Sequence, residues 1–331
     1  MGHINATTVV NRFKRTFGEE TLNELGKLSR FCRRERTVTP HRLALSLIEM
    51  FASGPVKYIA DLQRGFNALC ASNVQYKPFH NQLAKRSFAT FMRLLLTRLL
   101  NDLACKVLRF DSGSPFARFE QICLQDGTSF AVKRTLAEDF PGRFTTVSPA
   151  AVELHVNLEL LSEGLNTIVL SPDSMAERQF LPPVEALTGC LLLGDRGYFG
   201  KKYLCALDAA GGAFIVRGPA TMNPLIRRAW GPDGVEIKHF RNKHLKDVAG
   251  KLSRYVAVDM DVCYRIGARD FACRLVAHPN PREDIPRYLV TNLDRESFTI
   301  EHVSDGYRLR WQVELLFKEW KSFANLHAFD T

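Results

Sequence analysis

The sequence has no long run of apolar residues and no apolar core close to its N-terminus. A membrane-spanning helix needs about 20 mainly apolar residues in a row, and a secretory signal peptide needs an apolar stretch of about 7–15 residues. The opening residues, MGHINATTVVNRFKR, contain no such stretch. We therefore expect a protein of the cytoplasm that neither spans a membrane nor is secreted.

Closely spaced cysteine pairs are also lacking. The eight cysteines are scattered along the 331 residues and none of them forms a CxxC pair. This spacing argues against the usual zinc sites and against a disulfide framework, and it is typical of reduced thiols in a cytoplasm. Internal repeats and low-complexity tracts are absent as well, so the chain is expected to form ordinary globular domains.

Positive charge is present in excess, but only in one part of the chain. The net charge is +10, and residues 1–110 hold 18 Lys+Arg against 7 Asp+Glu, whereas the remainder holds 27 against 28. A basic module joined to a balanced one suggests a polyanion-binding domain attached to a domain that performs chemistry. The alternative is a basic helical domain that has no role with nucleic acid.

The N-terminal third has the residue pattern of helices. Thr39 is a good N-cap and Pro40 suits the first helical position, and apolar spacing predicts helices over residues 43–52, 56–69 and 79–104. This arrangement resembles a helix-turn-helix module, which is a weak signal because three-helix packing is common.

Two cations near the start of the third predicted helix are the candidate DNA contacts of this module. Lys85 and Arg86 are adjacent in the sequence, and basic residues beside a helix start are suited to phosphate. They give the N-terminal third its most specific prediction of a binding surface.

Beyond residue 110 the apolar pattern changes to the spacing of strands. Residues 118–132 predict a strand that ends at Asp126 in a glycine turn, and residues 150–161 and 165–171 predict two more. Residues 189–200 predict a short apolar strand that ends at Asp195. Because residues 211–290 are also rich in turns and alternating patterns, we expect an α/β fold with a mixed sheet.

Three acidic residues on separate elements are the candidate catalytic groups. Asp126 and Asp195 lie at predicted strand ends, where side chains are accessible, although an Asp-Gly pair alone is also a routine turn. Glu314 lies on a predicted helix. Hard divalent cations such as Mg²⁺ bind carboxylate oxygens, and two such ions can activate water and stabilise a leaving oxygen.

The helix that carries Glu314 has two predicted faces. At about 100° per residue, Tyr307, Arg310, Glu314 and Lys321 lie within an arc of roughly 60°, whereas Leu309, Val313, Leu316 and Trp320 lie opposite. We expect the second face to pack and the first to meet a phosphate backbone. Arg310 and Lys321 should then contribute little to the fold, and Trp311 and Trp320 should be packing residues.

These residues resemble a known family. The spacing Tyr307-x2-Arg310-x3-Glu314-x6-Lys321 is similar to the Y-x2-R-x3-E-x6-K signature of DDE transposases from bacterial insertion sequences. The blocks CLQDGTSF and LLLGDRGYFG resemble those that carry the first and second Asp of that family, here Asp126 and Asp195.

The resemblance implies a ribonuclease-H-like mixed-sheet core over residues 111–331, with a β-rich insertion at about residues 205–290, preceded by an all-helical DNA-binding domain over residues 1–110. It implies that Asp126, Asp195 and Glu314 are catalytic and bind Mg²⁺ or Mn²⁺. Tyr307, Arg310 and Lys321 would contact DNA.

The expected partners are double-stranded DNA, as element ends and target, and a second copy of the chain in a nucleoid-associated homodimer. The family usually continues with further helices after the position of Lys321, and these are expected to be missing here, because the sequence ends at Thr331.

Two other functions stay open from the sequence. One is another ribonuclease-H-like nuclease, which would cleave without joining a 3′-hydroxyl end to target DNA. The other is a shortened, inactive copy that binds the inverted repeats and represses transposition.

Overall fold

The computed structural model describes residues 14–32, 36–54, 56–107, 110–162, 164–279 and 286–323. The chain divides into two compact units, Met1–Leu103 and Ala104–Thr331. No helix among these described residues is long and apolar enough to cross a membrane.

Every regular element described in the first unit is a helix. Thr39 caps α3 as its sequence predicts, because its hydroxyl accepts a hydrogen bond of 3.2 Å from the Arg42 N–H. The apolar sides of the helices meet in a core that contains the buried rings of Phe31, Phe66 and Phe91. The helices are α2 (Glu19–Leu28), α3 (Pro40–Ser53), α4 (Ile59–Leu69), α5 (Tyr76–Leu83) and α6 (Arg86–Val107).

The prediction of one helix over residues 79–104 is wrong, because α5 ends at Leu83 and α6 begins at Arg86. Phe79 and Phe91 are both fully buried in the same core. In a continuous helix, residues twelve apart would point about 120° away from each other. A break between them lets both rings reach one core, and it leaves Lys85 between the two helices.

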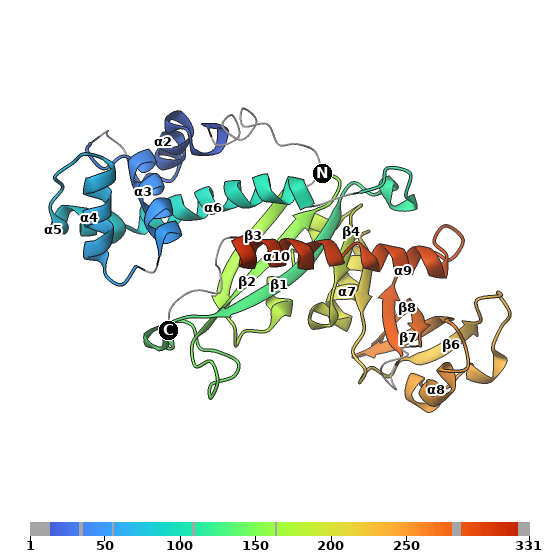
Figure 1. Ribbon diagram of the computed structural model, residues 1–331. Helices are drawn as coiled ribbons and strands as arrows, with labels where there is room; N and C mark the ends of the chain where they lie inside the picture. Colours follow the sequence, from blue (N-terminus) through green and yellow to red (C-terminus); the bar gives the residue numbers. More distant parts are fainter. Residues whose placement is uncertain are drawn as a thin grey trace. The chain divides into compact units, whose positions relative to one another are not determined.

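The second unit is built on one nine-stranded mixed sheet (Figure 1). The strand order is β3-β2-β1-β4-β5-β9-β8-β7-β6. The β1–β4 and β4–β5 pairs are parallel and every other pair is antiparallel. The strands are β1 (Ile122–Ala131), β2 (Ala151–Glu159), β3 (Gly164–Pro172), β4 (Leu191–Gly194), β5 (Ala213–Arg217), β6 (Leu225–Trp230), β7 (Val258–Ile266), β8 (Arg269–His278) and β9 (Arg287–Thr291).

This topology confirms the expected α/β class with a mixed sheet. It also shows how the β-rich segment joins the rest of the unit. The strands β6 to β8 are hydrogen-bonded through β9 to β5, so the segment extends the same sheet. A short helix, α8 (Leu245–Leu252), packs its apolar side into the core of this part.

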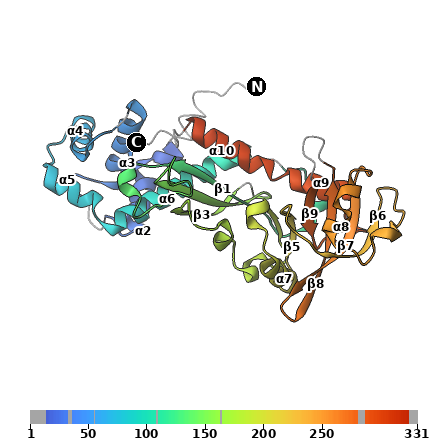
Figure 2. The ribbon, with the colours of Figure 1, turned by 90° about the horizontal axis from the view of Figure 1, so that it is seen from below.

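Helices cover both faces of the sheet. Leu204 and Leu207 of α7 (Lys201–Ala209) belong to the same core as Phe214 of β5. The next residue of that strand, Ile215, lies against Gly306 of α9 (Ile300–Arg308). Because neighbouring residues of a strand point to opposite faces, α7 and α9 lie on opposite sides of the sheet. Figure 2 shows α9 and α10 (Trp311–Phe323) following each other along one side.

The expected single helix over residues 307–322 is interrupted, since α9 ends at Arg308 and α10 begins at Trp311. The apolar face packs as expected, since Val313, Leu316 and Trp320 are buried. The expectation of an exposed polar face is wrong for two of its residues, because Tyr307 and Arg310 are only 4% and 5% exposed. Both helices therefore bury a broad surface that is apolar in one part and polar in another.

The two tryptophans of α10 differ in their surroundings. Trp320 is 1% exposed and packs edge-on against Phe317, whereas Trp311 is 59% exposed. Trp320 is thus the packing residue that the sequence predicts. The same prediction for Trp311 is wrong.

This contrast gives a matched test within one helix. Trp320→Ala should lower the free energy of unfolding by about 3–5 kcal/mol, because a large buried ring is removed. Trp311→Ala should change it by less than about 0.5 kcal/mol. Urea denaturation followed by circular dichroism measures both values, and equal losses for the two variants would contradict the packing described for α10.

Candidate active site

Asp126 and Asp195 lie where the ladder between β1 and β4 ends. The last residues paired across these two parallel strands are Gln125 and Gly194, so the next residue on each strand is one of the two aspartates. The prediction that the strand itself ends at Asp126 is wrong, since β1 continues to Ala131 in its pairing with β2. What ends at Asp126 is the pairing with β4, and this frees space on that side for both carboxylates.

Helices α9 and α10 bring two polar side chains to these carboxylates. The Tyr307 hydroxyl donates a hydrogen bond of 2.8 Å to Oδ1 of Asp195. The guanidinium of Arg310 donates from Nη1 to Oδ2 of Asp126 at 2.7 Å and from Nη2 to Oε1 of Glu314 at 2.5 Å. Five of the predicted site residues are therefore brought together at one place.

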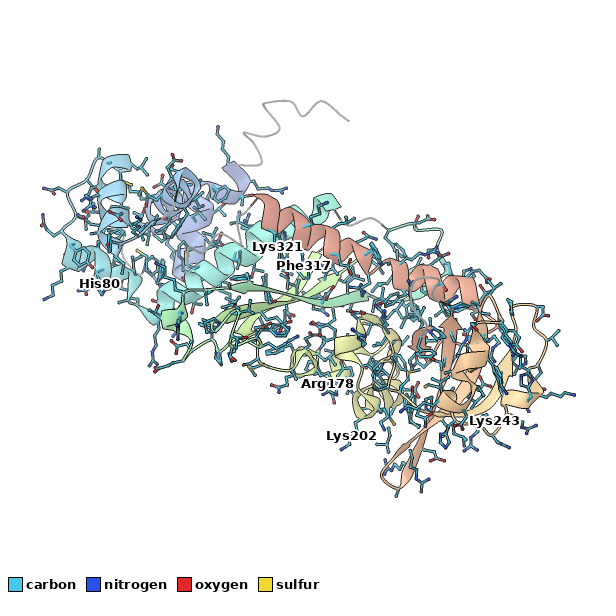
Figure 3. All side chains as sticks on the ribbon, turned by 60° about the horizontal axis from the view of Figure 1, so that its bottom comes forward. His80, Arg178, Lys202, Lys243, Phe317 and Lys321 are labelled. Carbon is cyan, nitrogen blue, oxygen red and sulfur yellow. The ribbon has the colours of Figure 1, made fainter. Side chains whose placement is uncertain are left out.

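The other three predicted residues lie outside this cluster of contacts. Lys321 is half-buried on α10, two turns after Glu314, and Figure 3 shows it one turn beyond Phe317. Lys85 and Arg86 are exposed and belong to the N-terminal unit, where they precede and begin α6.

Burial makes Arg310 part of the fold, so the expectation that it contributes little to the fold is wrong. Its side chain is 6% exposed and lies against two carboxylates, Asp126 at 15% and Glu314 at 45% exposure. Burial lowers the pKa of Arg310, but Tyr307 and the neighbouring carboxylates outweigh it and raise the net pKa, so the guanidinium is a permanent cation. Without this guanidinium, the partly buried carboxylates of Asp126 and Glu314 would lose the cation that neutralises them.

The two aspartates have opposite electrostatic environments. Burial raises the pKa of Asp126 to about 6, although Arg310 acts against the rise. Burial also raises the pKa of Asp195, but the Arg196 N–H, the Tyr307 hydroxyl and the nearby cations outweigh it, so the net pKa lies below its ordinary value. Asp195 is the carboxylate whose anionic form is better stabilised by its neighbours.

Comparison with known proteins shows the family of this chain. A family described as "Transposase DDE domain" matches residues 117–331. This match covers about two thirds of the chain and includes all three carboxylates. The chain belongs to this transposase family.

Similar proteins with known names are also transposases. The transposase of insertion sequence IS1151 from Clostridium perfringens is 19% identical over 349 residues, which cover 95% of this chain and 73% of the relative. The IS231C transposase from Bacillus thuringiensis subsp. berliner is 22% identical over 354 residues, 94% of this chain and 72% of the relative. The InsL protein of element IS186A from Escherichia coli, a putative transposase, is 50% identical over 40 residues, 12% of this chain and 11% of that protein.

The donor atoms of this transposase-family site suit a hard divalent cation, because all three side chains offer carboxylate oxygens. Among the residues that the structure describes, however, no group of three or more His, Cys, Asp or Glu has the spacing of a formed metal site. The Arg310 guanidinium lies between two of the three carboxylates. The donor chemistry therefore fits Mg²⁺ or Mn²⁺, while the space between the donors is taken by a protein cation.

A second polar cluster lies behind Asp126, on the other face of the sheet, and the sequence does not reveal it. A Cβ built on Gly127 would lie 2.6 Å from Oε1 of Glu153 and 3.3 Å from the Tyr198 hydroxyl. Glu153 and Tyr198 are both buried. Among the described residues, Oε2 of Glu153 and the Tyr198 hydroxyl have no hydrogen-bond partner, although Oε2 lies 3.5 Å from Nη2 of Arg143. Burial raises the pKa of Glu153 to about 7.

The alternation in AVELHVNLELL predicts one buried and one solvated face for β2. All nine residues of β2 are instead buried. The polar face is covered by segments distant in sequence, such as Phe180, whose ring stacks on His155 at 3.7 Å. Only the strict recurrence of polar residues at every second position, from Glu153 to Glu159, could have drawn attention to this face.

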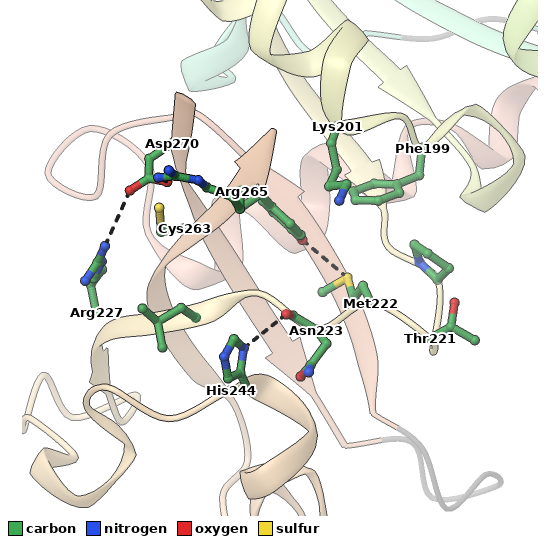
Figure 4. Close-up of a pocket in the computed structure, with 13 residues that line it drawn as sticks. Phe199, Lys201, Thr221, Met222, Asn223, Arg227, His244, Cys263, Arg265 and Asp270 are labelled. Carbon is green, nitrogen blue, oxygen red and sulfur yellow. Dashed lines mark hydrogen bonds and ion pairs between the residues drawn. The ribbon is translucent and has the colours of Figure 1, made fainter. Parts of the chain in front are cut away.

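A cavity of about 590 Å³ lies near the chain segments that follow Asp195 and Arg217 (Figure 4). Lys201 and Phe199 line it on one side, and Met222 accepts a contact of 3.6 Å from the Tyr264 hydroxyl within it. Its two arginines, Arg227 and Arg265, both pair with Asp270. Much of its positive charge is therefore already compensated.

Gly306 sets the distance between α9 and the sheet, and so the position of Tyr307. A Cβ at this residue would lie 2.6 Å from Cζ of Phe116 and 2.7 Å from Cδ1 of Ile215, closer than real contacts allow. By contrast, a Cβ on Gly250 of α8 would meet no atom within 4 Å.

These two glycines should respond oppositely to alanine. Gly306→Ala should lower the free energy of unfolding by about 1–3 kcal/mol through overpacking, despite the better helix propensity of Ala. Gly250→Ala should raise it by up to about 1 kcal/mol, because only propensity changes. Melting temperatures of the two variants test this, and a stabilised Gly306→Ala protein would show that α9 does not pack so closely.

Proposed function

We propose that this chain is a DNA transposase of the DDE type that binds the terminal inverted repeats of an insertion sequence, cleaves DNA at the element ends and joins the freed 3′-hydroxyl to target DNA. The observation that carries the proposal is that three separate elements bring Asp126, Asp195 and Glu314 to one place, where Arg310 contacts Asp126 and Glu314 and Tyr307 contacts Asp195. Membership of the transposase family and the names of the relatives support the same reaction class.

The sheet order supports a ribonuclease-H-like core. In the part β3-β2-β1-β4-β5, three antiparallel-linked strands are followed by two parallel ones, and the carboxylates lie beside the end of the parallel ladder. We assign catalysis to residues 111–331, with a β-rich insertion at about residues 205–290, and DNA binding to residues 1–110. The working form is a homodimer on two DNA ends, associated with the nucleoid.

In this proposal Asp126, Asp195 and Glu314 hold Mg²⁺ or Mn²⁺. The bound metal would polarise the scissile phosphate and lower the pKa of a water molecule. Tyr307 orients Asp195 through the hydrogen bond from its hydroxyl, and burial around Asp126 excludes bulk water. Lys321, on the same helix as Glu314, contacts a backbone phosphate of the strand being cut.

Arg310 has a different role from the one its spacing alone suggests. In the DNA-free protein its guanidinium neutralises Asp126 and Glu314, so it acts as an internal counter-ion that keeps the carboxylates together. A divalent cation held by these carboxylates would neutralise their charge in place of the guanidinium. The guanidinium is then free to turn toward a DNA phosphate.

The function is tested by strand cleavage on duplexes that carry the inverted repeats flanking the gene. Alanine at Asp126, Asp195 or Glu314 should reduce the cleavage rate by on the order of 10³ or more, because metal positioning contributes several kcal/mol to transition-state stabilisation. Glu185→Ala, an exposed acid of the same unit, is the control and should cleave normally.

DNA binding by the carboxylate variants should persist. Near-normal cleavage by Asp126→Ala would overturn the assignment of the site. Cleavage without joining to target would indicate another nuclease, and tight binding of wild-type protein without cleavage would indicate a repressor.

The counter-ion role of Arg310 is tested without DNA. In metal-free buffer, Arg310→Ala should lower the free energy of unfolding by about 3 kcal/mol, because it leaves partly buried carboxylates without a partner. Added Mn²⁺ should raise the melting temperature of Arg310→Ala by more than that of wild type, because the ion no longer competes with a guanidinium.

Arg308→Ala is the matched control, since Arg308 is 74% exposed and pairs with the exposed Asp305. It should change the free energy of unfolding by less than about 0.5 kcal/mol. If Arg310→Ala melted like Arg308→Ala and responded to Mn²⁺ like wild type, Arg310 would not be the counter-ion of this site.

A further inference from the structure

The N-terminal unit contains a surface cavity of about 720 Å³, and its lining includes Lys85, one of the two cations that the sequence marks as candidate DNA contacts. Its lining comes from residues 30–32 at the end of α2, from residues 36–38 before α3, and from residues between 74 and 85, which include α5. Three of its lining residues are cations, and others are apolar or amide side chains. Its lining includes Arg30, Phe31, Arg36, Val74, Gln82 and Lys85.

The end of α2 presents Arg30 at this cavity. Arg30 has a left-handed backbone conformation with φ of 58°, and the N–H of Phe31 donates to the carbonyl of Gly26 at 3.0 Å. This is the usual way in which a helix ends with a reversal of chain direction. The reversal leaves the Arg30 side chain exposed while Phe31 enters the core.

Lys85 lies over the ring of Phe31, the residue that follows Arg30. Its ammonium lies 5.4 Å from the centre of the Phe31 ring and donates to Oε1 of Gln82 at 2.5 Å. The break between α5 and α6 places Lys85 here, since a continuous helix would direct it elsewhere. Lys85 also immediately precedes Arg86, the first residue of α6, and a helix start attracts anions.

The positive charge of the cavity is not compensated within the part of the chain that the structure describes. No carboxylate there forms an ion pair with Arg30, Arg36 or Lys85, whereas the exposed Arg64 of the same unit pairs with Asp61. The cavity of about 590 Å³ in the second unit is different, because both of its arginines form ion pairs with Asp270. Three uncompensated cations around one hollow attract a ligand with several negative charges.

We propose that this cavity binds the sugar–phosphate backbone of DNA, with Arg30, Arg36 and Lys85 contacting neighbouring phosphates and the half-buried Val74 contacting deoxyribose. The proposal rests on the proposed function, which supplies DNA as the ligand. A single inorganic anion would use only part of a hollow of this size and only some of its cations. Several phosphates on one strand would use all of them.

A backbone site has a property that a base-reading site lacks. Phosphate contacts fix the position of a protein on the duplex without carrying sequence information. Loss of one such contact weakens binding to every sequence by the same factor and lowers the salt dependence, whose logarithmic slope is about −0.9 per phosphate contact. The cavity should therefore contribute equally to specific and non-specific binding.

The experiment measures fluorescence anisotropy of full-length protein on two duplexes, one with the terminal inverted repeat and one with the same bases in scrambled order, at several salt concentrations. The cavity variants are Arg36→Gln, Lys85→Gln and their combination. The controls are Lys57→Gln and Lys77→Gln, which remove the same charge from exposed positions of the same unit that do not line the cavity.

Each single cavity variant should bind both duplexes about tenfold or more weakly, as expected for loss of a charge-assisted phosphate contact, and its salt slope should fall by about one. The double variant should lose about the product of the two factors. The controls should remain within about twofold of wild type. Circular dichroism confirms that the helices of every variant are intact.

Three results would overturn the proposal. Cavity variants that bind like the controls would show that the hollow does not meet DNA. A loss confined to the inverted-repeat duplex would indicate base reading, and competition by inorganic phosphate at low millimolar concentration would indicate a small-anion site. If wild-type protein bound neither duplex, the proposed function would fail as well, whereas normal wild-type binding with unaffected cavity variants contradicts this inference alone.

Discussion

Three carboxylates can converge in a folded protein only if their mutual repulsion is neutralised, and here the guanidinium of Arg310 does this. It contacts Asp126 on the sheet and Glu314 on α10, and its charge also acts on Asp195. Arg310 is nearly inaccessible to solvent, so the attraction is weakly screened and removal of one partner is costly. The docking of α10 on β1 depends on this ion pair as well as on apolar packing by residues such as Trp320.

The sheet supplies the positions that this electrostatic arrangement needs. The parallel ladder between β1 and β4 stops one residue before each aspartate, so the two side chains emerge side by side where strands separate. Gly306 then allows α9 to approach β5 closely enough for the Tyr307 hydroxyl to reach Asp195. The strand pairing and the absence of a side chain at Gly306 thus position the polar groups.

The sequence predicts five residues that the structure brings together, but it does not predict their contacts. Asp126 and Asp195 follow apolar strands beside glycines, and the spacing from Tyr307 to Lys321 is specific enough to indicate the family. Burial of Tyr307 and Arg310 could not be predicted, because helical periodicity reports which residues share a face and not what that face meets. A polar face that meets buried carboxylates looks identical, in sequence, to one that meets water.

Breaks in helices were missed for a related reason. The interruptions at Lys85 and at Leu309–Arg310 involve no proline or glycine, so local propensity gives no signal for them. Each break follows from what distant parts of the chain require: two phenylalanines entering one core in the first case, and an arginine directed at two carboxylates in the second. The burial of the polar residues on β2 could not be predicted for the same reason, because the segment that covers them lies elsewhere in the sequence.

The place of β9 in the sheet has a consequence for how the protein is made. This strand of five residues pairs with β5 on one side and with β8 on the other, yet residues 218–286 separate it from β5 in the chain. During synthesis, β5 and β8 therefore both have an unpaired edge until β9 leaves the ribosome. Open strand edges readily pair with other chains, so a nascent chain that stalls before residue 287 should be the species most prone to aggregation.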